Sequence, residues 1–295
     1  MPSSFRSQAA HLRAAYTRET HSLAAPGIAR RGINTPFPGS GLGLDVRTAP
    51  QRRLRALLAL GLLNHGPASA WPRHVSLADI TRYTLVVSPR HKDLVITAGA
   101  PYNVACWLVG RDKRPQIGLP GLRVEASYEE GWRLRHLPTG AIMTVTGDRH
   151  GRLKGPAVLD SNYVGLWTVD VPLSDEEHAV LNALPLLDTD TETLLAALAV
   201  RLCTHAPNGI WDIGMWFYDR TDRPERGHAH RRRLSVENSR CALHWDSAPH
   251  PEDLCAALTD PVIGLAGAAA QATSDGWLLH YNRSSLAAHP VAYRH

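Results

Sequence analysis

Residues 122–146, LRVEASYEEGWRLRHLPTGAIMTVT, decide the fold class of this chain. Apolar and polar side chains alternate along three runs, residues 122–127, 132–137 and 141–146, as they do along strands with one buried face. Pro138-Thr139-Gly140 supplies the residue types of a tight turn between the second and third runs. The segment therefore predicts a mostly antiparallel sheet of consecutive strands.

Helices and further strands are predicted before this segment. Residues 7–31 are rich in alanine and predict a helix, interrupted near Pro26. The leucines of residues 51–64 recur at helical spacing, which predicts a second helix with Arg52, Arg53 and Arg55 on its outer side. Runs with the alternation of strands lie at residues 83–88, 93–97 and 103–109, and another follows the central segment at residues 163–169.

The pattern changes after residue 173. Ser174-Asp-Glu-Glu177 and Asp188-Thr-Asp-Thr-Glu192 are typical helix starts, because a capping side chain precedes acidic residues in the first turn. Strands are predicted at residues 210–218, 232–236, 240–246 and 276–282, and a helix at residues 250–258. No internal repeat of fixed period is visible.

These elements predict an α+β fold: a helical N-terminal region, a mostly antiparallel sheet, and a C-terminal half that mixes helices and strands. We expect a basic helical arm with a Gly/Pro-rich linker at residues 1–50. A helix pair with the antiparallel sheet is expected at residues 51–172, and an α+β half at residues 173–295. The Gly-rich residues 39–43 lack the Lys-Ser/Thr of a phosphate-binding loop and predict a hinge.

Positive charge is concentrated at the front of the chain. Residues 1–55 hold nine arginines against Glu19 and Asp45, a balance of +7, whereas the whole chain is +5. A basic lead segment on a slightly acidic body is typical of contact with a polyanion, and nucleic acid is the first candidate. An acidic protein is an alternative partner for the same surface. The abundance of arginine itself also fits a GC-rich genome of actinobacterial type, so the position of the charge carries the inference.

This charge distribution favours a non-catalytic regulatory or accessory protein that contacts phosphates of nucleic acid through arginine. The predicted phosphate contacts are Arg30, Arg31, Arg52, Arg53, Arg55, Arg82, Arg231, Arg232 and Arg233. No cofactor is expected in this interpretation.

The phrases LRALLALGLLNHGP and VSLADITRY, within residues 54–83, resemble part of a winged helix-turn-helix domain. The resemblance implies a short helix in the major groove of DNA, with Arg82, Arg90, His91 and Lys92 facing the DNA. The alternative is a helix pair that packs on the sheet that follows.

His244-Trp-Asp246 has the H-x-D spacing of a two-histidine, one-carboxylate iron site. On a strand, positions i and i+2 point to one face, so both side chains would reach one metal. His280 or His289 would supply the third ligand. The motif resembles that of the Fe(II)/2-oxoglutarate oxygenases, which implies bound Fe(II) and an enzyme. A strand whose His and Asp make only local hydrogen bonds is the alternative.

The remaining composition predicts a cytoplasmic protein. The four cysteines, Cys106, Cys203, Cys241 and Cys255, lie in apolar stretches without CxxC spacing, which is typical of buried free thiols. The first twenty residues have no apolar core of a secretory signal, and no stretch is long and apolar enough to cross a membrane.

Overall fold

The computed structural model describes residues 4–28, 39–64, 83–109, 118–157, 165–213, 233–245 and 250–290. Its helices are α1 (Phe5–Thr17), α2 (His21–Ala24), α3 (Ala49–Leu62), α5 (Pro101–Leu108), α6 (Asp175–Ala183), α7 (Thr189–Arg201) and α8 (Pro251–Thr259), with 3-10 helices η1 (Ala25–Gly27) and η2 (Gly39–Leu42). Its strands are β1 (Thr84–Pro89), β2 (Asp93–Ala98), β3 (Leu122–Tyr128), β4 (Gly131–His136), β5 (Ile142–Thr146), β6 (Arg233–Glu237), β7 (Arg240–Trp245), β8 (Ala268–Thr273), β9 (Gly276–Tyr281) and β10 (Ser284–Pro290). This arrangement confirms the α+β class.

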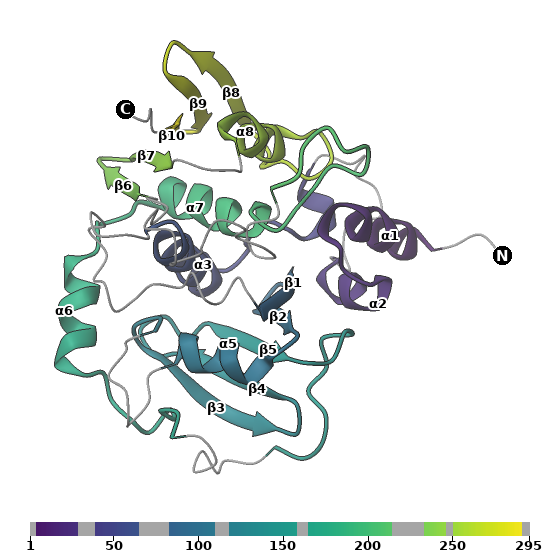
Figure 1. The fold of residues 1–295 in the computed structure, drawn as a ribbon, viewed down its shortest axis with the longest axis vertical. Helices are drawn as coiled ribbons and strands as arrows, with labels where there is room; N and C mark the ends of the chain where they lie inside the picture. Colours follow the sequence, from purple (N-terminus) through teal and green to yellow (C-terminus); the bar gives the residue numbers. More distant parts are fainter. Residues whose placement is uncertain are drawn as a thin grey trace, which may run out of the picture.

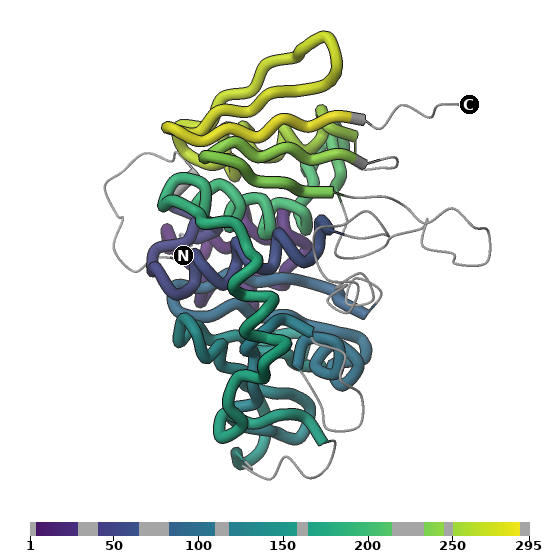
Figure 2. The backbone as a smooth tube through the Cα atoms, turned by 90° about the vertical axis from the view of Figure 1, so that its left-hand side faces the viewer, coloured from purple at the N-terminus to yellow at the C-terminus, as the bar shows by residue number. Residues whose placement is uncertain are grey.

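The described strands form two five-stranded sheets, with the orders β1-β2-β5-β4-β3 and β6-β7-β10-β9-β8. Each sheet is antiparallel except for one parallel pair, β2 with β5 and β7 with β10. Figure 1 shows the sheets at opposite ends of the molecule with α3 and α7 packed between them, and the side view of Figure 2 shows the same layers. The two helices therefore form the centre of the molecule.

The chain contains one structural unit twice. A helix (α3 or α7) is followed by a hairpin (β1-β2 or β6-β7), a second helix (α5 or α8) and a three-stranded meander (β3-β4-β5 or β8-β9-β10). In both units the last strand of the meander pairs in parallel with the second strand of the hairpin. We call residues 49–146 the N-terminal repeat and residues 189–290 the C-terminal repeat.

Strand register places matched residues in matched rows. One row of the N-terminal repeat runs through Leu94, Met143, Leu134 and Val124. The corresponding row of the C-terminal repeat runs through Cys241, Leu286, Leu279 and Ala270. All of these side chains belong to the hydrophobic core or pack against it. The two sheets therefore agree in register as well as in strand order.

The sequence carries traces of this repeat. Helices α5 and α8 read PYNVACWL and PEDLCAALT, and both start with proline at the first helical position. Strands β4 and β9 both start with Gly-Trp. Matched residues lie 150 positions apart at Pro101 and Pro251 but 145 apart at Trp132 and Trp277. Because the separation changes along the chain, the repeat has no fixed period.

Matched residues of the two repeats meet where α3 packs on α7. Arg52 and Glu192 occupy the same position in their helices, 140 residues apart, and Arg52 Nε lies 2.8 Å from Glu192 Oε2. Contact between equivalent positions is what a two-fold relation between two copies produces. The ion pair therefore marks an approximate two-fold relation between the repeats.

The residues just before this ion pair, Gln51 in α3 and Thr191 in α7, make equivalent contacts in the two repeats. The buried Gln51 side chain donates to the Ile142 carbonyl of β5 at 2.6 Å. The buried Thr191 hydroxyl forms a hydrogen bond of 2.9 Å with the Ser284 hydroxyl of β10. Each contact ties the start of a central helix to the start of the last strand in its repeat.

The structure corrects the strand predicted at residues 103–109, because Pro101–Leu108 form helix α5. Val104 and Leu108 are buried on one face of that helix, so their spacing is helical. Strands β8 and β10 lie where no strand is predicted, since alanine and serine give them little apolar alternation. The predicted strand at 210–218 is described only to residue 213, where it forms one isolated bridge.

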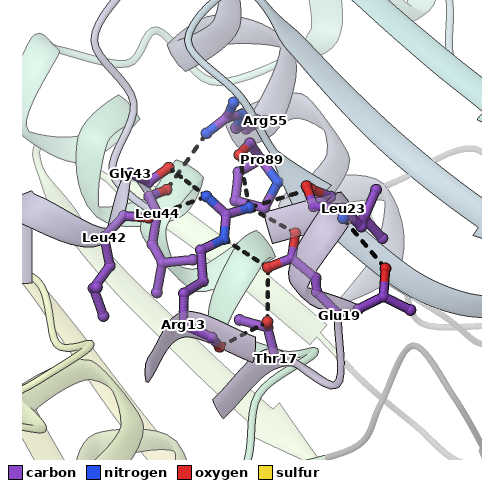
Figure 3. A network of polar contacts seen from close by, with 11 residues as sticks. Arg13, Thr17, Glu19, Leu23, Leu42, Gly43, Leu44, Arg55 and Pro89 are labelled. Carbon is purple, nitrogen blue, oxygen red and sulfur yellow. Dashed lines mark hydrogen bonds and ion pairs between the residues drawn. The ribbon is translucent and has the colours of Figure 1, made fainter. Parts of the chain in front are cut away.

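The Gly-rich residues 39–43, predicted as a hinge, are fixed from inside the protein (Figure 3). The fully buried Arg13 donates to the Leu42 carbonyl at 3.0 Å, and the fully buried Arg55 lies beside the same segment. Gly43 has φ 71°, and a Cβ there would lie 1.9 Å from the Gly27 carbonyl oxygen. Only glycine fits this close approach, so the segment is a packed part of the core.

Candidate functional site

The arginines predicted on α3 have partners inside the protein. Arg52 and Arg53 both bind the carboxylate of Glu192, at 2.8 and 3.3 Å. Arg55, predicted on the outer side of the helix, is fully buried and donates to the Arg90 carbonyl at 2.8 Å. Burial lowers the pKa of Arg55 to about 9, an effect that the nearby Arg13 adds to. Arg55 is therefore a structural residue that no phosphate can reach.

The other described arginines of residues 1–55 also have partners in the chain. Arg6 donates to the Ala25 carbonyl, and Arg18 pairs with Asp212 at 2.6 Å. The buried Arg13 is bound to Glu19 (Figure 3), and Arg47 has a partner as well. Arg30, Arg31, Arg82, Arg231 and Arg232 lie outside the described residues, as does most of the segment that resembles a winged helix-turn-helix. Arg233 is described and exposed, at the start of β6.

The predicted metal ligands are only partly brought together. His244 on β7 lies directly opposite His289 on β10, with stacked rings whose centroids are 4.9 Å apart. Burial, His289 and Arg233 together lower the pKa of His244. His280 lies on β9 opposite Ser285, toward the other end of the sheet. Asp246 lies outside the described residues, and the described part of the chain holds no group of three metal-ligating side chains. The iron site stays a prediction.

The two repeats differ most clearly in how the outer edges of their sheets are protected, more than in any cluster of side chains. An edge strand exposes unpaired N–H and C=O groups, and proteins cover such edges or protect them with charge, proline or bulges. The four edges here are β1 and β3 in the N-terminal repeat and β6 and β8 in the C-terminal repeat.

Edge strand β3 is covered by residues 166–172, which we call the strap. The Val124 N–H donates to the Trp167 carbonyl at 2.9 Å, and the Val169 N–H donates to the Val124 carbonyl at 3.1 Å. This pairing is a parallel bridge between Val124 and Thr168. The strap therefore adds extended backbone to the sheet at Val124.

Arg123 holds the strap in place. Its fully buried guanidinium donates to the carbonyls of Val171 and Pro172, at 2.9 and 2.8 Å, and lies 4.9 Å above the Trp167 ring. Glu177 of α6 neutralises it, with 2.6 Å between Arg123 Nη2 and Glu177 Oε2. Burial raises the pKa of Glu177, but hydrogen bonds from Arg123 and two backbone N–H groups outweigh this and leave it lowered.

The outer edges of β6 and β1 are also protected. The Asn64 amide binds both backbone groups of Leu234 in β6, donating to its carbonyl at 3.0 Å and accepting from its N–H at 3.2 Å. β1 has a register shift, ends at Pro89, and has the Pro89 carbonyl bound by Arg13. Each of these edges therefore carries a feature that stops strand addition.

Edge strand β8 differs from the other three. Its sequence, AAAQAT, contains no charge and no proline, and its pairing with β9 has no register shift. No segment of the described residues pairs with its outer edge. Figures 1 and 2 show the β8-β9 hairpin standing out from the rest of the sheet. We take this open edge as the candidate functional site.

The turn of the hairpin fixes which backbone groups face outward. Thr273 and Gly276 flank the two-residue turn and form the closing hydrogen-bonded pair, so Gln271 and Ala269 also bond toward β9. Ala270 and Ala272 therefore direct their N–H and C=O groups outward. The same rule makes Leu234 face outward from β6, as its bonds to Asn64 show.

The sequence predicts no strand at residues 268–273, where β8 lies. The signal present is an uncharged alternating run before the turn residues Ser274 and Asp275. Alanine satisfies helix and strand patterns equally well, so this signal is weak without the structure.

The described residues support neither a membrane-spanning helix nor a reactive cysteine. No described helix has the length and apolar character needed to cross a bilayer. All four cysteines are free thiols, and burial raises the pKa of Cys241 and of Cys255 to about 12, which disfavours the reactive thiolate. Comparison of the chain with family models, curated proteins and solved structures found no match.

Proposed function

We propose that this chain is a protein–protein interaction module that binds an extended segment of polypeptide along β8. The observation that carries the proposal is the contrast at one matched position. Val124 of β3 uses its outward N–H and C=O to hold the strap, and Ala270 of β8 presents the same groups with no partner among the described residues. Strand addition to an open sheet edge is a common mode of peptide recognition.

The side chains of β8 favour this mode of binding. Ala269, Gln271 and Thr273 are exposed and uncharged, so an incoming strand meets neither bulk nor unpaired charge. Main-chain hydrogen bonds would supply most of the affinity, and side chains beside the edge would supply selectivity. Binding needs no catalytic group, in keeping with the non-catalytic function favoured by the sequence.

Photo-crosslinking tests the proposal in the cells that make the protein. A benzophenone amino acid at Ala269, beside the open edge, is expected to give covalent adducts with polypeptide. The same probe at Ser235, on the edge strand that Asn64 protects, is the matched control and is expected to give far fewer. Equal yields at the two positions, or none at Ala269, would contradict the proposal.

Nucleic-acid binding stays a prediction. Of its described residues, Arg53 and Arg233 are exposed enough for phosphate contact; the Arg53 side chain is 60% exposed. Titration with duplex and single-stranded DNA at two salt concentrations tests it, because phosphate contacts weaken steeply as salt rises. Affinity that is absent or indifferent to salt removes this function.

A further inference from the structure

We infer that the segment bound along β8 is β8 of a second copy of this chain, paired antiparallel about Ala270. This inference rests on the proposed function and names the partner. The two sheets would join edge to edge into one continuous sheet across a two-fold axis, with α8 of both copies on the same face. Such an interface is isologous, because the same strand serves both copies.

The outward backbone groups fix the register. In antiparallel pairing, residues that direct their N–H and C=O groups across the interface oppose one another. Ala270 would therefore exchange hydrogen bonds with the second copy's Ala270, and the Ala272 N–H would donate to the second copy's Ala268 carbonyl. The Ala268 N–H is already bound to the Leu265 carbonyl at 2.9 Å, which leaves only its carbonyl free for pairing.

The composition of β8 is suited to pairing with an identical strand. The strand is uncharged, free of proline and regular in register, so a second copy opposes it without like charges or a break in pairing. In this register Ala269 would lie opposite the second copy's Gln271, in a pair that makes no backbone hydrogen bonds. Small side chains let the two strands approach at ordinary sheet spacing.

The charged turn selects the antiparallel direction. Asp275 follows β8 in the hairpin turn and its side chain is 70% exposed. Antiparallel pairing about Ala270 places the two copies of Asp275 at opposite ends of the shared strand pair. Parallel pairing in register would place them side by side, and neighbouring like charges destabilise strand pairs.

Sedimentation velocity of the full chain over a concentration series tests the inference. The wild-type protein is expected to shift from monomer to dimer as concentration rises. Ala270→Pro removes an outward N–H at a position where proline is tolerated on an edge strand, and it is expected to stay monomeric. The matched control is Val236→Pro, at an outward position of edge strand β6, which is expected to dimerise like the wild type.

Disulfide trapping tests the register. Ala269→Cys and Gln271→Cys proteins mixed under mild oxidation are expected to crosslink to each other much faster than either does with itself. Their Cα atoms would be about 4.5 Å apart in a pair without backbone hydrogen bonds, within disulfide reach. Thr273→Cys is the control and is expected to stay uncrosslinked, since its two copies would lie far apart. The wild type measures background from its own thiols.

The outcomes separate this inference from the proposed function. A protein that stays monomeric at every concentration, yet gives adducts at Ala269 with other polypeptides, overturns the second copy as partner and leaves the module standing. A dimer that survives Ala270→Pro also overturns the inference, because another surface then makes it. A monomer with no adducts at Ala269 removes both.

Discussion

The two repeats share a fold but differ in whether the outer edges of their sheets are covered. In the N-terminal repeat the strap covers β3, and Arg13 with a register shift and Pro89 protects β1. In the C-terminal repeat Asn64 protects β6, while β8 is open within the described residues. A duplicated unit thus allows one copy to close its sheet while the other keeps an edge available. The proposed binding would use the edge that the C-terminal repeat leaves uncovered.

The difference can be followed to single positions. Arg123, which holds the strap, corresponds to Ala269 in β8, and Val124 corresponds to Ala270. The C-terminal repeat therefore has neither the guanidinium that anchors a strap nor the larger side chain beside it. Both repeats keep the polar tie between central helix and last strand, at Gln51 and Thr191. The scaffold is the same in both, and only the edge has diverged.

The largest expected effect comes from removing the counter-ion of the strap. Glu177→Leu leaves the fully buried Arg123 without its carboxylate, which costs about 3–5 kcal/mol for a buried ion pair. Urea unfolding measures the loss, and proteolysis within the strap should become faster in the variant. Glu176→Leu, an exposed neighbour in the first turn of α6, is the matched control and should change stability little. A Glu177 variant as stable as the control contradicts this account of the strap.

Acid should weaken the protein through His136, which corresponds to Tyr281 in the C-terminal repeat. Burial lowers the pKa of His136 to about 4, so the folded protein keeps it neutral while an unfolded histidine, with a pKa near 6.5, takes up a proton. Because the unfolded state then binds more protons, roughly 3 kcal/mol of stability is lost as pH falls from about 6.5 to about 4. His136→Gln should flatten that window in urea unfolding at several pH values. An unchanged slope assigns the effect to other groups.

Removing the protection of β6 should cost less. Asn64→Leu leaves the buried N–H and C=O of Leu234 without partners, a loss of about 2 kcal/mol. Asn64→Asp keeps the acceptor for the Leu234 N–H but loses the donor to its carbonyl. Its stability in chemical denaturation should therefore lie between those of the wild type and Asn64→Leu. A second open edge should also raise self-association, which sedimentation detects. Equal stability of all three proteins would show that water replaces the amide.

The smallest effect is expected where the repeats meet. Arg52 and Glu192 are partly exposed, with side chains 20% and 11% exposed, so their pairing contributes about 0.5–1 kcal/mol. Arg52→Glu places two carboxylates together, and Glu192→Arg adds a third guanidinium group beside Arg52 and Arg53. The double variant restores an Arg–Glu pair but leaves Arg53 beside the new arginine, so it should recover part of the stability in a double-mutant cycle. Additive losses would place the matched residues apart in solution.

Much of this fold could be predicted from the sequence, and the reasons for the failures are specific. Leu122–Thr146 has large apolar residues in alternation, and its three strands were predicted correctly. Residues 103–109 were predicted as a strand although Val104 and Leu108 have helical spacing, because the run is short and mostly apolar; they belong to helix α5, Pro101–Leu108. β8 and β10 were missed because alanine and serine carry little pattern.

The candidate site could not be predicted in the same way. Whether a strand edge is open depends on which strands pair and on what covers them. Neither can be predicted from the local sequence. The charge pattern of the front arginines did not reveal that Arg13 and Arg55 are buried, since Glu19 and several carbonyls that bind them come together only in the fold. The domain boundary expected near residue 172 stays a prediction.

Hydrogen exchange at two matched amides tests the central claim most directly. The Val124 N–H is bonded to the strap and should be protected at every protein concentration, whereas the Ala270 N–H should exchange quickly in dilute, monomeric protein. Rising concentration should protect Ala270 and leave Val124 unchanged. Strong protection of Ala270 in the dilute monomer would mean that the chain covers β8 itself, and the open edge would not exist.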